Sequence, residues 1–184
     1  MLKDGGLYNF KNATFAIISA MTLGVDVDCA ISALATFKGV CRRFEHTGDI
    51  CGVPVYFDFA HHPTEIGCVL KRASANGKIL AVFQPHTYSR TKAYFENFVD
   101  VFGADKNIGS LIFMPTYAAR EKFDKDYEVY SLAVAIADKY GKISSFANEN
   151  DVAELVEKLA KFHEIVLFIG AGDIYDVKDK LKYD

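Results

Sequence analysis

The run Ile79-Leu-Ala-Val-Phe83, followed at once by Gln84-Pro-His-Thr-Tyr-Ser-Arg-Thr91, is the stretch that most directly indicates the fold. Five apolar residues bounded by a polar turn are typical of a parallel strand that is buried on both faces. Comparable runs occur at 53–57, 110–113 and 165–169, with a weaker one at 142–146. Amphipathic helical patterns separate them, including those at 91–102 and 149–161. Strands that alternate with helices predict an α/β domain with a mostly parallel sheet.

Two helical patterns precede the first of these strands. They cover 12–23, with Phe15 and Leu23 near one stripe, and 27–36, with Ala30 and Leu34 facing inward. No strand separates them, and two short helices form a poor domain, so we interpret them as the end of another domain. Further along the chain, Ser131 is expected to cap a helix that Gly141 ends.

Composition and charge exclude several classes of protein. Apolar residues make up 51% of the 184 residues and charged residues 24%, which excludes a disordered chain. The net charge of −3 argues against a nucleic-acid partner. No run approaches about 18 apolar residues, so no membrane partner is expected. The N-terminal residues Met1-Leu-Lys-Asp-Gly-Gly6 lack the apolar core of a signal peptide, which predicts a cytoplasmic location.

The cysteines support the same compartment. Cys29, Cys41, Cys51 and Cys68 form neither a C-x-x-C pair nor a zinc-ribbon spacing. We therefore expect reduced thiols that behave as small buried hydrophobic residues.

Polar side chains follow the first two predicted strands. The strand at 53–57 runs into Asp58-Phe-Ala-His-His-Pro-Thr-Glu65, and the strand at 79–83 runs into the polar stretch quoted above. Because ligands bind outside the carboxyl ends of parallel strands, we expect these side chains to share a functional edge. The set comprises Asp58, His61, His62, His86 and Arg90.

Structural interpretations stand beside the functional ones. Pro63 and Glu65 suit the first turn of a helix, and Asp58 is as well placed to cap a turn as to bind a ligand. Gly170-Ala-Gly172 matches a dinucleotide loop weakly and favours a tight turn. Arg42-Arg43 alone is a solvated pair. A metal-dependent hydrolase that uses His61, His62, Glu65 and His86 is an alternative of another class.

The motifs, taken in order, resemble the Mur ligases. The resemblance rests on Arg42-Arg-Phe44, on the stretches 58–65 and 83–91, and on Gly170-Ala-Gly-Asp-Ile174. Gly6-Leu-Tyr-Asn9-Phe-Lys-Asn12-Ala13 is similar to a helix start in the family's central domain. The resemblance implies that 1–43 is a remnant of the central ATPase domain and that 44–184 is the Rossmann-like C-terminal domain.

The family resemblance also implies a reaction. The sequence is most similar to the branch of the family that joins L-alanine to UDP-N-acetylmuramate in peptidoglycan precursor synthesis. That branch uses ATP and Mg²⁺ and proceeds through an acyl phosphate. The branch that recycles murein tripeptide is an alternative, but it departs from the stretch 83–91 that is intact here. The family's catalytic P-loop lysine, magnesium-binding glutamate and modified lysine all correspond to positions before Met1. No catalytic group and no metal ligand is therefore assigned, and the chain alone is expected to be inactive.

The resemblance gives roles to seven residues. Four of them correspond to nucleotide-binding positions: Asn9 and Asn12 for adenine, Arg43 for the phosphates and Asp58 for the ribose. His61, His86 and Arg90 correspond to residues around the incoming amino acid, with Arg90 on its carboxylate. Two positions depart from the family pattern: Phe59 stands where many relatives have tyrosine, and Thr87 stands where some relatives have a second arginine.

Overall fold

The computed structural model describes residues 7–37 and 39–184. The stretch Met1–Gly6, on which the expectation of no signal peptide rests, lies outside the described residues. The chain divides into two compact units between Val40 and Cys41, and each unit is described by itself. In the described residues, no helix combines the length and the apolar character needed to cross a bilayer.

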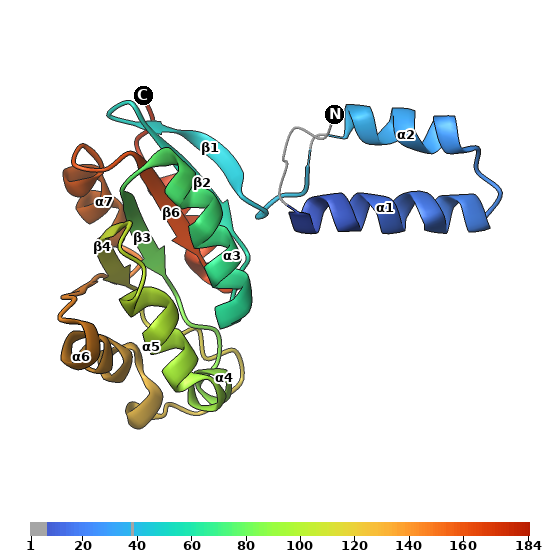
Figure 1. Cartoon of the computed structure of the whole chain (residues 1–184). Helices are drawn as coiled ribbons and strands as arrows, with labels where there is room; N and C mark the ends of the chain where they lie inside the picture. Colours follow the sequence, from blue (N-terminus) through green and yellow to red (C-terminus); the bar gives the residue numbers. More distant parts are fainter. Residues whose placement is uncertain (1–6, 38) are drawn as a thin grey trace. The chain divides into compact units, whose positions relative to one another are not determined.

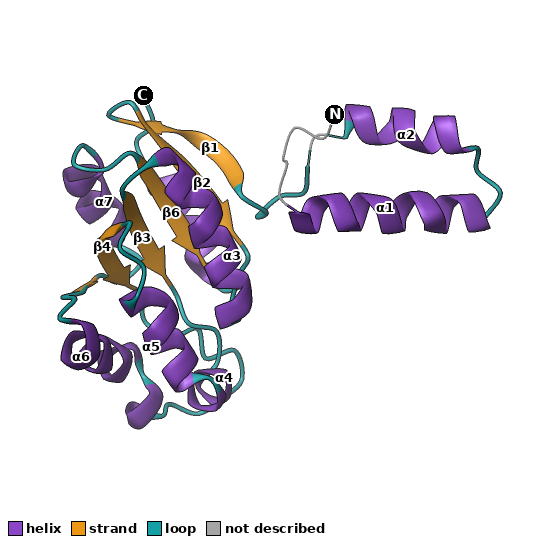
Figure 2. Ribbon diagram, in the orientation of Figure 1, coloured by secondary structure: helices purple, strands orange, loops and turns teal. Residues whose placement is uncertain are grey.

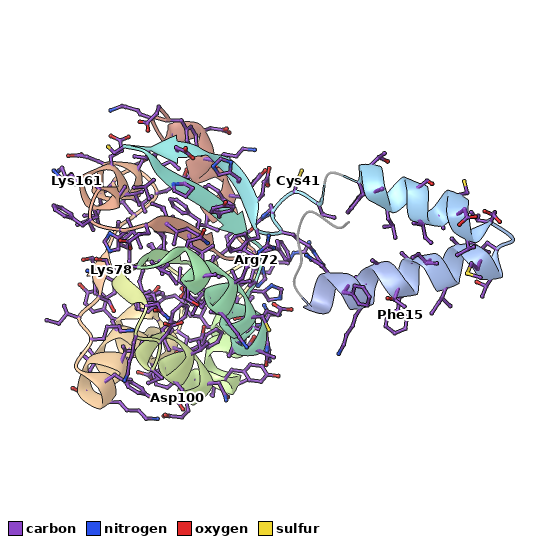
Figure 3. The ribbon with its side chains drawn as sticks, turned by 45° about the horizontal axis from the view of Figure 1, so that its top comes forward. Phe15, Cys41, Arg72, Lys78, Asp100 and Lys161 are labelled. Atoms are coloured by element: carbon purple, nitrogen blue, oxygen red, sulfur yellow. The ribbon has the colours of Figure 1, made fainter. Side chains whose placement is uncertain are left out.

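The first unit is a pair of helices, α1 (Leu7–Thr22) and α2 (Val27–Thr36). Gly24, with φ 85°, lies in the turn between them, and the Asp26 carboxylate caps α2 by accepting from two backbone N–H groups. The two predicted helices are confirmed, but the stripe that holds Phe15 and Leu23 is not buried within this unit. Phe15, labelled in Figure 3, is 68% exposed, and Leu23 is more exposed still. Two helices bury only a narrow strip against each other, and Ala30 is the buried residue on α2.

The second unit is built on a six-stranded sheet (Figure 2). Its strands are β1 (Glu45–Ile50), β2 (Val53–Asp58), β3 (Ile79–Phe83), β4 (Ile108–Phe113), β5 (Ser145–Phe146) and β6 (Ile165–Ile169). They lie in the order β1-β2-β6-β3-β4-β5, and every neighbouring pair is parallel except β1 and β2. The predicted mostly parallel α/β sheet is therefore confirmed.

Helices cover both faces of this sheet (Figure 1). The helical elements are α3 (Pro63–Ala73), η1 (Ser74–Asn76), α4 (Tyr88–Ala93), α5 (Phe95–Gly103), η2 (Lys125–Tyr127), α6 (Val129–Tyr140), α7 (Val152–Ala160) and η3 (Asp173–Lys180). One core lies under α3, α5 and α6 and includes Phe83 and Phe113. The other lies under α7 and η3, where the Phe57 and Phe168 rings stack at 4.4 Å. The result is a three-layer arrangement with the sheet in the middle.

Strand β1 has no counterpart among the predicted strands. Its sequence, EHTGDI, has no apolar run because it is the edge strand and half-exposed. It turns into β2 through Cys51 and Gly52, whose φ values of 53° and 73° fit a two-residue hairpin turn. The Asp184 carboxylate accepts from both of their N–H groups, at 3.0 and 2.6 Å, and so ties the C-terminus to this hairpin.

Three other expectations are corrected. The helix expected over 91–102 is two helices, α4 and α5, broken at Tyr94. The residue at the N-cap of α6 is Glu128 rather than Ser131, whereas Gly141 ends the helix in the left-handed conformation as expected. All four cysteines are exposed, because they lie in turns and on the outer faces of helices, and they are free thiols.

Candidate functional site

Asp58 ends β2 and anchors the turn that precedes β1. Its Oδ2 accepts from the Phe44 N–H and its Oδ1 from the Ala60 N–H, both at 2.8 Å. Burial raises the pKa of Asp58, and these two bonds together with the charges of Arg43 and Arg72 act in the opposite direction. Asp58 therefore caps turns, as the structural interpretation predicts, while each carboxylate oxygen keeps a second lone pair for a ligand.

The two adjacent arginines differ in their surroundings. The Arg42 guanidinium donates to Gly170 O and Gly172 O, at 3.0 and 2.9 Å, so it is part of the fold rather than a solvated charge. Arg43 is exposed, and its positive charge acts on Asp58. The structure thus brings together two of the predicted nucleotide-binding residues, Arg43 and Asp58, at the carboxyl end of β2.

The double histidine begins α3. His62 is the N-cap, and its Nδ1 accepts from the Thr64 N–H at 3.2 Å. Glu65 completes a capping box by accepting from the N–H groups of His61 and His62. Partial burial would raise the pKa of Glu65, but these backbone bonds and the neighbouring imidazoles lower it below its usual value. His62 and Glu65 therefore have structural roles, as expected for Glu65.

His61 faces the end of β3, where His86 and Arg90 lie. The His61 and His86 ring centroids are 5.9 Å apart, and Arg90 Nη1 lies 3.3 Å from His86 Nδ1. The Tyr117 ring packs against His86 at 5.5 Å, and Tyr117 O accepts from the Thr87 N–H. All three residues expected to surround an amino acid thus lie at one edge of the sheet.

Hydrogen bonding fixes the tautomers of the two histidines. His61 Nδ1 lies 2.9 Å from Phe59 O, and because a carbonyl oxygen only accepts, Nδ1 carries a proton and donates this bond. Arg90 only donates, so His86 Nδ1 accepts and Nε2 carries the proton. Burial and, to a lesser degree, the positive charge of Arg90 lower the pKa of His86 below its usual value, which favours the neutral imidazole.

Thr87 has a strained backbone. Its φ of 69° is unusual for a β-branched residue. Its carbonyl accepts from the Thr91 hydroxyl at 3.1 Å and its N–H donates to Tyr117 O. These bonds hold the strained residue between His86 and the start of α4, and strain of this kind clusters at functional sites.

Gln84 is a residue that the sequence analysis did not single out. It is 4% exposed. Its Nε2 donates to Asp173 Oδ1 at 2.6 Å and to Pro115 O at 3.3 Å, while its Oε1 accepts from the Ile174 N–H at 3.0 Å. Gln84 thereby holds the loops after β4 and β6 to the end of β3. The one sequence feature that could have indicated a role for Gln84 is its place two residues before His86 in the stretch 83–91.

The glycine loop after β6 fits closely against this end of β3. A Cβ atom on Gly170 would lie 2.9 Å from Gln84 O, and one on Gly172 would lie 2.7 Å from the Tyr117 Cβ. The Gly170 N–H donates to Asp58 O at 3.0 Å. These contacts require glycine and agree with the tight turn that the sequence favoured.

Asn9 and Asn12 lie in the first unit. They are three residues apart on α1, so they share one side of the helix. Their assignment to adenine stays a prediction, since it concerns the first unit and the other site residues belong to the second.

The geometry gives the hydrolase alternative no support. Among the residues that the structure describes, no group of three or more His, Cys, Asp or Glu side chains is arranged to hold a metal ion. Two of the four proposed ligands, His62 and Glu65, are instead engaged at the start of α3.

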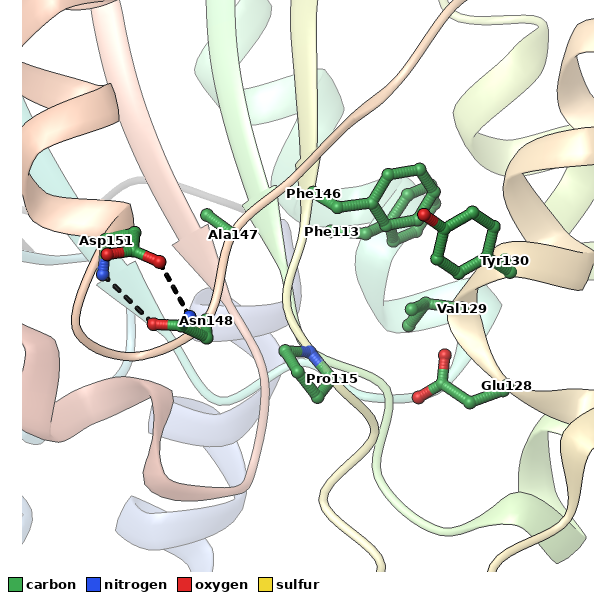
Figure 4. Close-up of a pocket in the computed structure, with 9 residues that line it drawn as sticks. All are labelled: Phe113, Pro115, Glu128, Val129, Tyr130, Phe146, Ala147, Asn148 and Asp151. Atoms are coloured by element: carbon green, nitrogen blue, oxygen red, sulfur yellow. Dashed lines mark hydrogen bonds between the residues drawn. The ribbon is translucent and has the colours of Figure 1, made fainter.

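A separate pocket of about 360 Å³ lies at the carboxyl ends of β4 and β5 (Figure 4). The stacked rings of Tyr130 and Phe146, 4.3 Å apart, form one side, and the hydrogen-bonded pair Asn148 and Asp151 lies on the other. None of the sequence-predicted site residues lines it. The candidate site therefore lies at the ends of β2, β6 and β3, away from this pocket.

Comparison with known proteins agrees with these motifs. The family described as Mur ligase, glutamate ligase domain, matches residues 42–172. The chain belongs to the Mur ligase family. Two curated relatives are named UDP-N-acetylmuramate--L-alanine ligase. The one from Clostridium botulinum (strain Eklund 17B / Type B) is 36% identical over 97% of this chain, and the one from Bradyrhizobium diazoefficiens is 41% identical over 95%.

A solved Mur ligase structure shares the fold. UDP-N-acetylmuramate-alanine ligase MurC from Thermotoga maritima is 27% identical over 97% of this chain, with a TM-score of 0.70. The chain covers 39% of the Clostridium ligase, 37% of the Bradyrhizobium ligase and 38% of the Thermotoga ligase. This Mur ligase chain thus spans well under half of each relative, and it matches their C-terminal domain.

Proposed function

We propose that this chain is the C-terminal part of an ATP-dependent ligase that joins L-alanine to UDP-N-acetylmuramate in the synthesis of peptidoglycan precursors. The observation that carries the proposal is the shared sheet edge, where Arg43 and Asp58 lie at the end of β2 and His61 faces His86 and Arg90. Arg43 and Asp58 form a nucleotide half of the site, and His61, His86 and Arg90 form an amino-acid half beside it. Such an arrangement suits a reaction in which a carboxylate is activated and then attacked by an amine. The names of the relatives support the choice of substrates.

The nucleotide half fits a ribose and a phosphate. Asp58 retains lone pairs beside its two backbone bonds and accepts from ribose hydroxyls. Arg43 is exposed and provides a fork of donors for phosphate oxygens. Asn9 and Asn12 contact adenine in this proposal. The resemblance assigns the Mg²⁺ ligands to the family's central domain, and we propose no Mg²⁺ ligand in this chain.

The amino-acid half fits an α-amino acid. Within the described part of the chain, the Arg90 guanidinium forms no ion pair with a carboxylate, so its charge is available to the carboxylate of L-alanine. The His86 Nε2–H is a further donor at this site. The His61 Nε2 accepts a hydrogen bond from the alanine amine and so directs it toward the activated carbonyl carbon.

ATP supplies the phosphoryl group that activates the muramate carboxyl as an acyl phosphate. The residues of this chain orient the two reactants, and their contribution is positioning and charge stabilisation. Catalytic groups are expected in the preceding domains, so the 184-residue chain alone is expected to release no phosphate. We keep the cytoplasmic location as part of the proposal, since its substrates are nucleotide-linked.

The test compares two proteins. The DNA upstream of the Met1 codon is read for an in-frame P-loop domain, and the complete ligase is assayed with ATP, Mg²⁺, UDP-N-acetylmuramate and L-alanine. We expect phosphate release that depends on L-alanine, and none from the 184-residue chain. Release that depends on murein tripeptide in place of L-alanine would assign the recycling reaction instead. Robust release by the 184-residue chain would contradict the proposed division of labour.

A further inference from the structure

The side chain of Arg42 joins three segments at the candidate site. Its Nη2 donates to Gly170 O and Gly172 O in the loop after β6. Its Cζ lies 4.7 Å from the centroid of the Phe59 ring and 5.0 Å from that of the Tyr175 ring. Cation–π attraction and two hydrogen bonds therefore hold this guanidinium at once, and the planar shape of arginine suits both.

The backbone around Arg42 is in an uncommon conformation. Arg42 and Phe44 have φ values of 61° and 49°, although neither is glycine. Such residues persist only where the surrounding structure fixes them. Here the Arg42 N–H donates to Glu45 Oε2 at 2.6 Å, and Arg42 O accepts from the Phe59 N–H at 2.7 Å. The Phe44 N–H donates to Asp58 Oδ2 at 2.8 Å, so both strained residues are held.

Two further contacts brace this turn. The Tyr175 hydroxyl donates to both carboxylate oxygens of Glu45, at 3.2 and 3.0 Å, so Tyr175 supports the turn through its hydroxyl as well as its ring. On the other side, the Phe44 ring packs 4.4 Å from the Tyr56 ring and lies 4.0 Å from the Arg72 Cζ. The turn is therefore fixed from both faces.

Arg43 lies between the two left-handed residues. It is exposed, and it is the cation next to Asp58 in the chain's nucleotide half. A long exposed side chain normally samples many rotamers, and ordering it costs entropy. A backbone fixed on both sides limits where its guanidinium can reach.

We propose that Arg42 is a positioning residue, which fixes the turn 41–45 so that the Arg43 guanidinium faces the nucleotide phosphates. The proposal rests on the proposed nucleotide role of Arg43. The proposal also explains the residue at position 59: the Arg42 guanidinium packs on the face of an aromatic ring there, and this contact needs no hydroxyl. Phenylalanine therefore replaces tyrosine there without loss of the contact with Arg42.

The first test uses the 184-residue chain and measures the carboxyl titration of Asp58 by ¹³C NMR. Arg43→Met removes the cation beside Asp58 and is expected to raise its pKa. Arg42→Met leaves Arg43 in place but releases the turn, and we expect a rise of similar size. Arg72→Met is the control for the other cation near Asp58. An Asp58 titration unchanged by Arg42→Met would overturn the proposal.

The second test uses steady-state kinetics of the complete ligase. Arg42→Met is expected to raise the KM for ATP about ten-fold and to change the KM for L-alanine less than about two-fold. Arg42→Lys should recover only part of the loss, since an ammonium cannot match the planar contacts. Phe59→Tyr should keep the wild-type KM for ATP, and Phe59→Leu should raise it. Phe59 is 42% exposed, so neither variant threatens the fold.

The outcomes separate this proposal from the proposed function. If Arg43→Met raises the KM for ATP and Arg42→Met does not, the positioning role of Arg42 is wrong and the nucleotide role of Arg43 stands. If neither variant changes the KM for ATP, both the positioning role of Arg42 and the nucleotide role of Arg43 are wrong. If Arg42→Met alone raises it, Arg42 acts on the nucleotide directly and the positioning role is again wrong. Equal rises in both KM values would indicate a general loss of structure and would also overturn the proposal.

Discussion

Gln84→Met should destabilise the second unit far more than its size suggests. Methionine keeps the length and roughly the volume of glutamine, so the packing at this buried site changes little. All three hydrogen bonds of the amide are lost, however, and with them the link from β3 to the loops after β4 and β6. The loss is therefore almost purely one of hydrogen bonding.

The size of the decrease in the free energy of unfolding depends on whether each former hydrogen-bond partner of Gln84 can bond to water instead. The Ile174 N–H is buried and loses its acceptor, which costs about 1–3 kcal/mol. The Asp173 carboxylate is exposed, so water replaces the lost donor and the cost is nearer 1 kcal/mol. The 3.3 Å contact with Pro115 O adds little. The expected decrease in the free energy of unfolding is thus about 2–4 kcal/mol.

The assay is urea unfolding followed by far-ultraviolet circular dichroism, because the chain has no tryptophan to report by fluorescence. With an m-value of about 2 kcal/mol/M, the midpoint should fall by about 1–2 M. Asn76→Met is the matched control, since its amide makes one 3.3 Å bond to Ala73 O, and it should change stability by less than about 0.5 kcal/mol. If both variants unfold at the wild-type midpoint, Gln84 does not join the loops as argued.

Three further predictions concern the same edge. In the complete ligase, Arg90→Ala should lower kcat/KM for L-alanine about ten- to hundred-fold with little change in the KM for ATP, and the reverse pattern in steady-state kinetics would refute the split between the two halves. Because the pKa of His86 lies below 6.5 in the folded chain, the unfolded chain binds more protons in the window below pH 6.5, and stability should fall as the pH falls through it. His86→Gln should flatten that part of the urea-midpoint profile, and parallel profiles would contradict the assignment. Gly172→Ala should lower the melting temperature by crowding Gln84. Gly67→Ala, within α3, should raise it slightly, because the added methyl meets only the Val101 side chain, at an ordinary 3.5 Å.

The central strands of the fold could be predicted because strands that are buried on both faces have continuous apolar sequences. The runs at 79–83 and 165–169 are apolar throughout, and β3 and β6 are buried at every position. An edge strand leaves no such signal, which is why β1 was missed. The break between α4 and α5 was missed for another reason. Tyr94 is an ordinary helix residue, and its ring lies 4.5 Å from the His62 ring, a contact that only the tertiary structure supplies.

The candidate site divides in the same way. Residues that follow a strand end, such as His61 and His86, could be placed at one edge because the topology of a parallel sheet brings such ends together. Gln84 and Arg42 reach partners 90 and about 130 residues away, and no local pattern reports such a contact. The prediction that the cysteines are buried was wrong because it rested on an average tendency of thiols to be buried, with no local pattern to support it. The four thiols are free, as predicted.

The position of β6 has a consequence for how the protein is made. The strand formed by residues 165–169 lies between β2 and β3, so the sheet is complete only after these residues have been synthesised. Until residues 165–169 have left the ribosome, the facing edges of β2 and β3 have no partner and are open to other chains. Folding of this unit is therefore expected to begin only after β6 has emerged from the ribosome. A stop codon that removes β6 would leave two unjoined halves of a sheet and an aggregation-prone product that depends on chaperones.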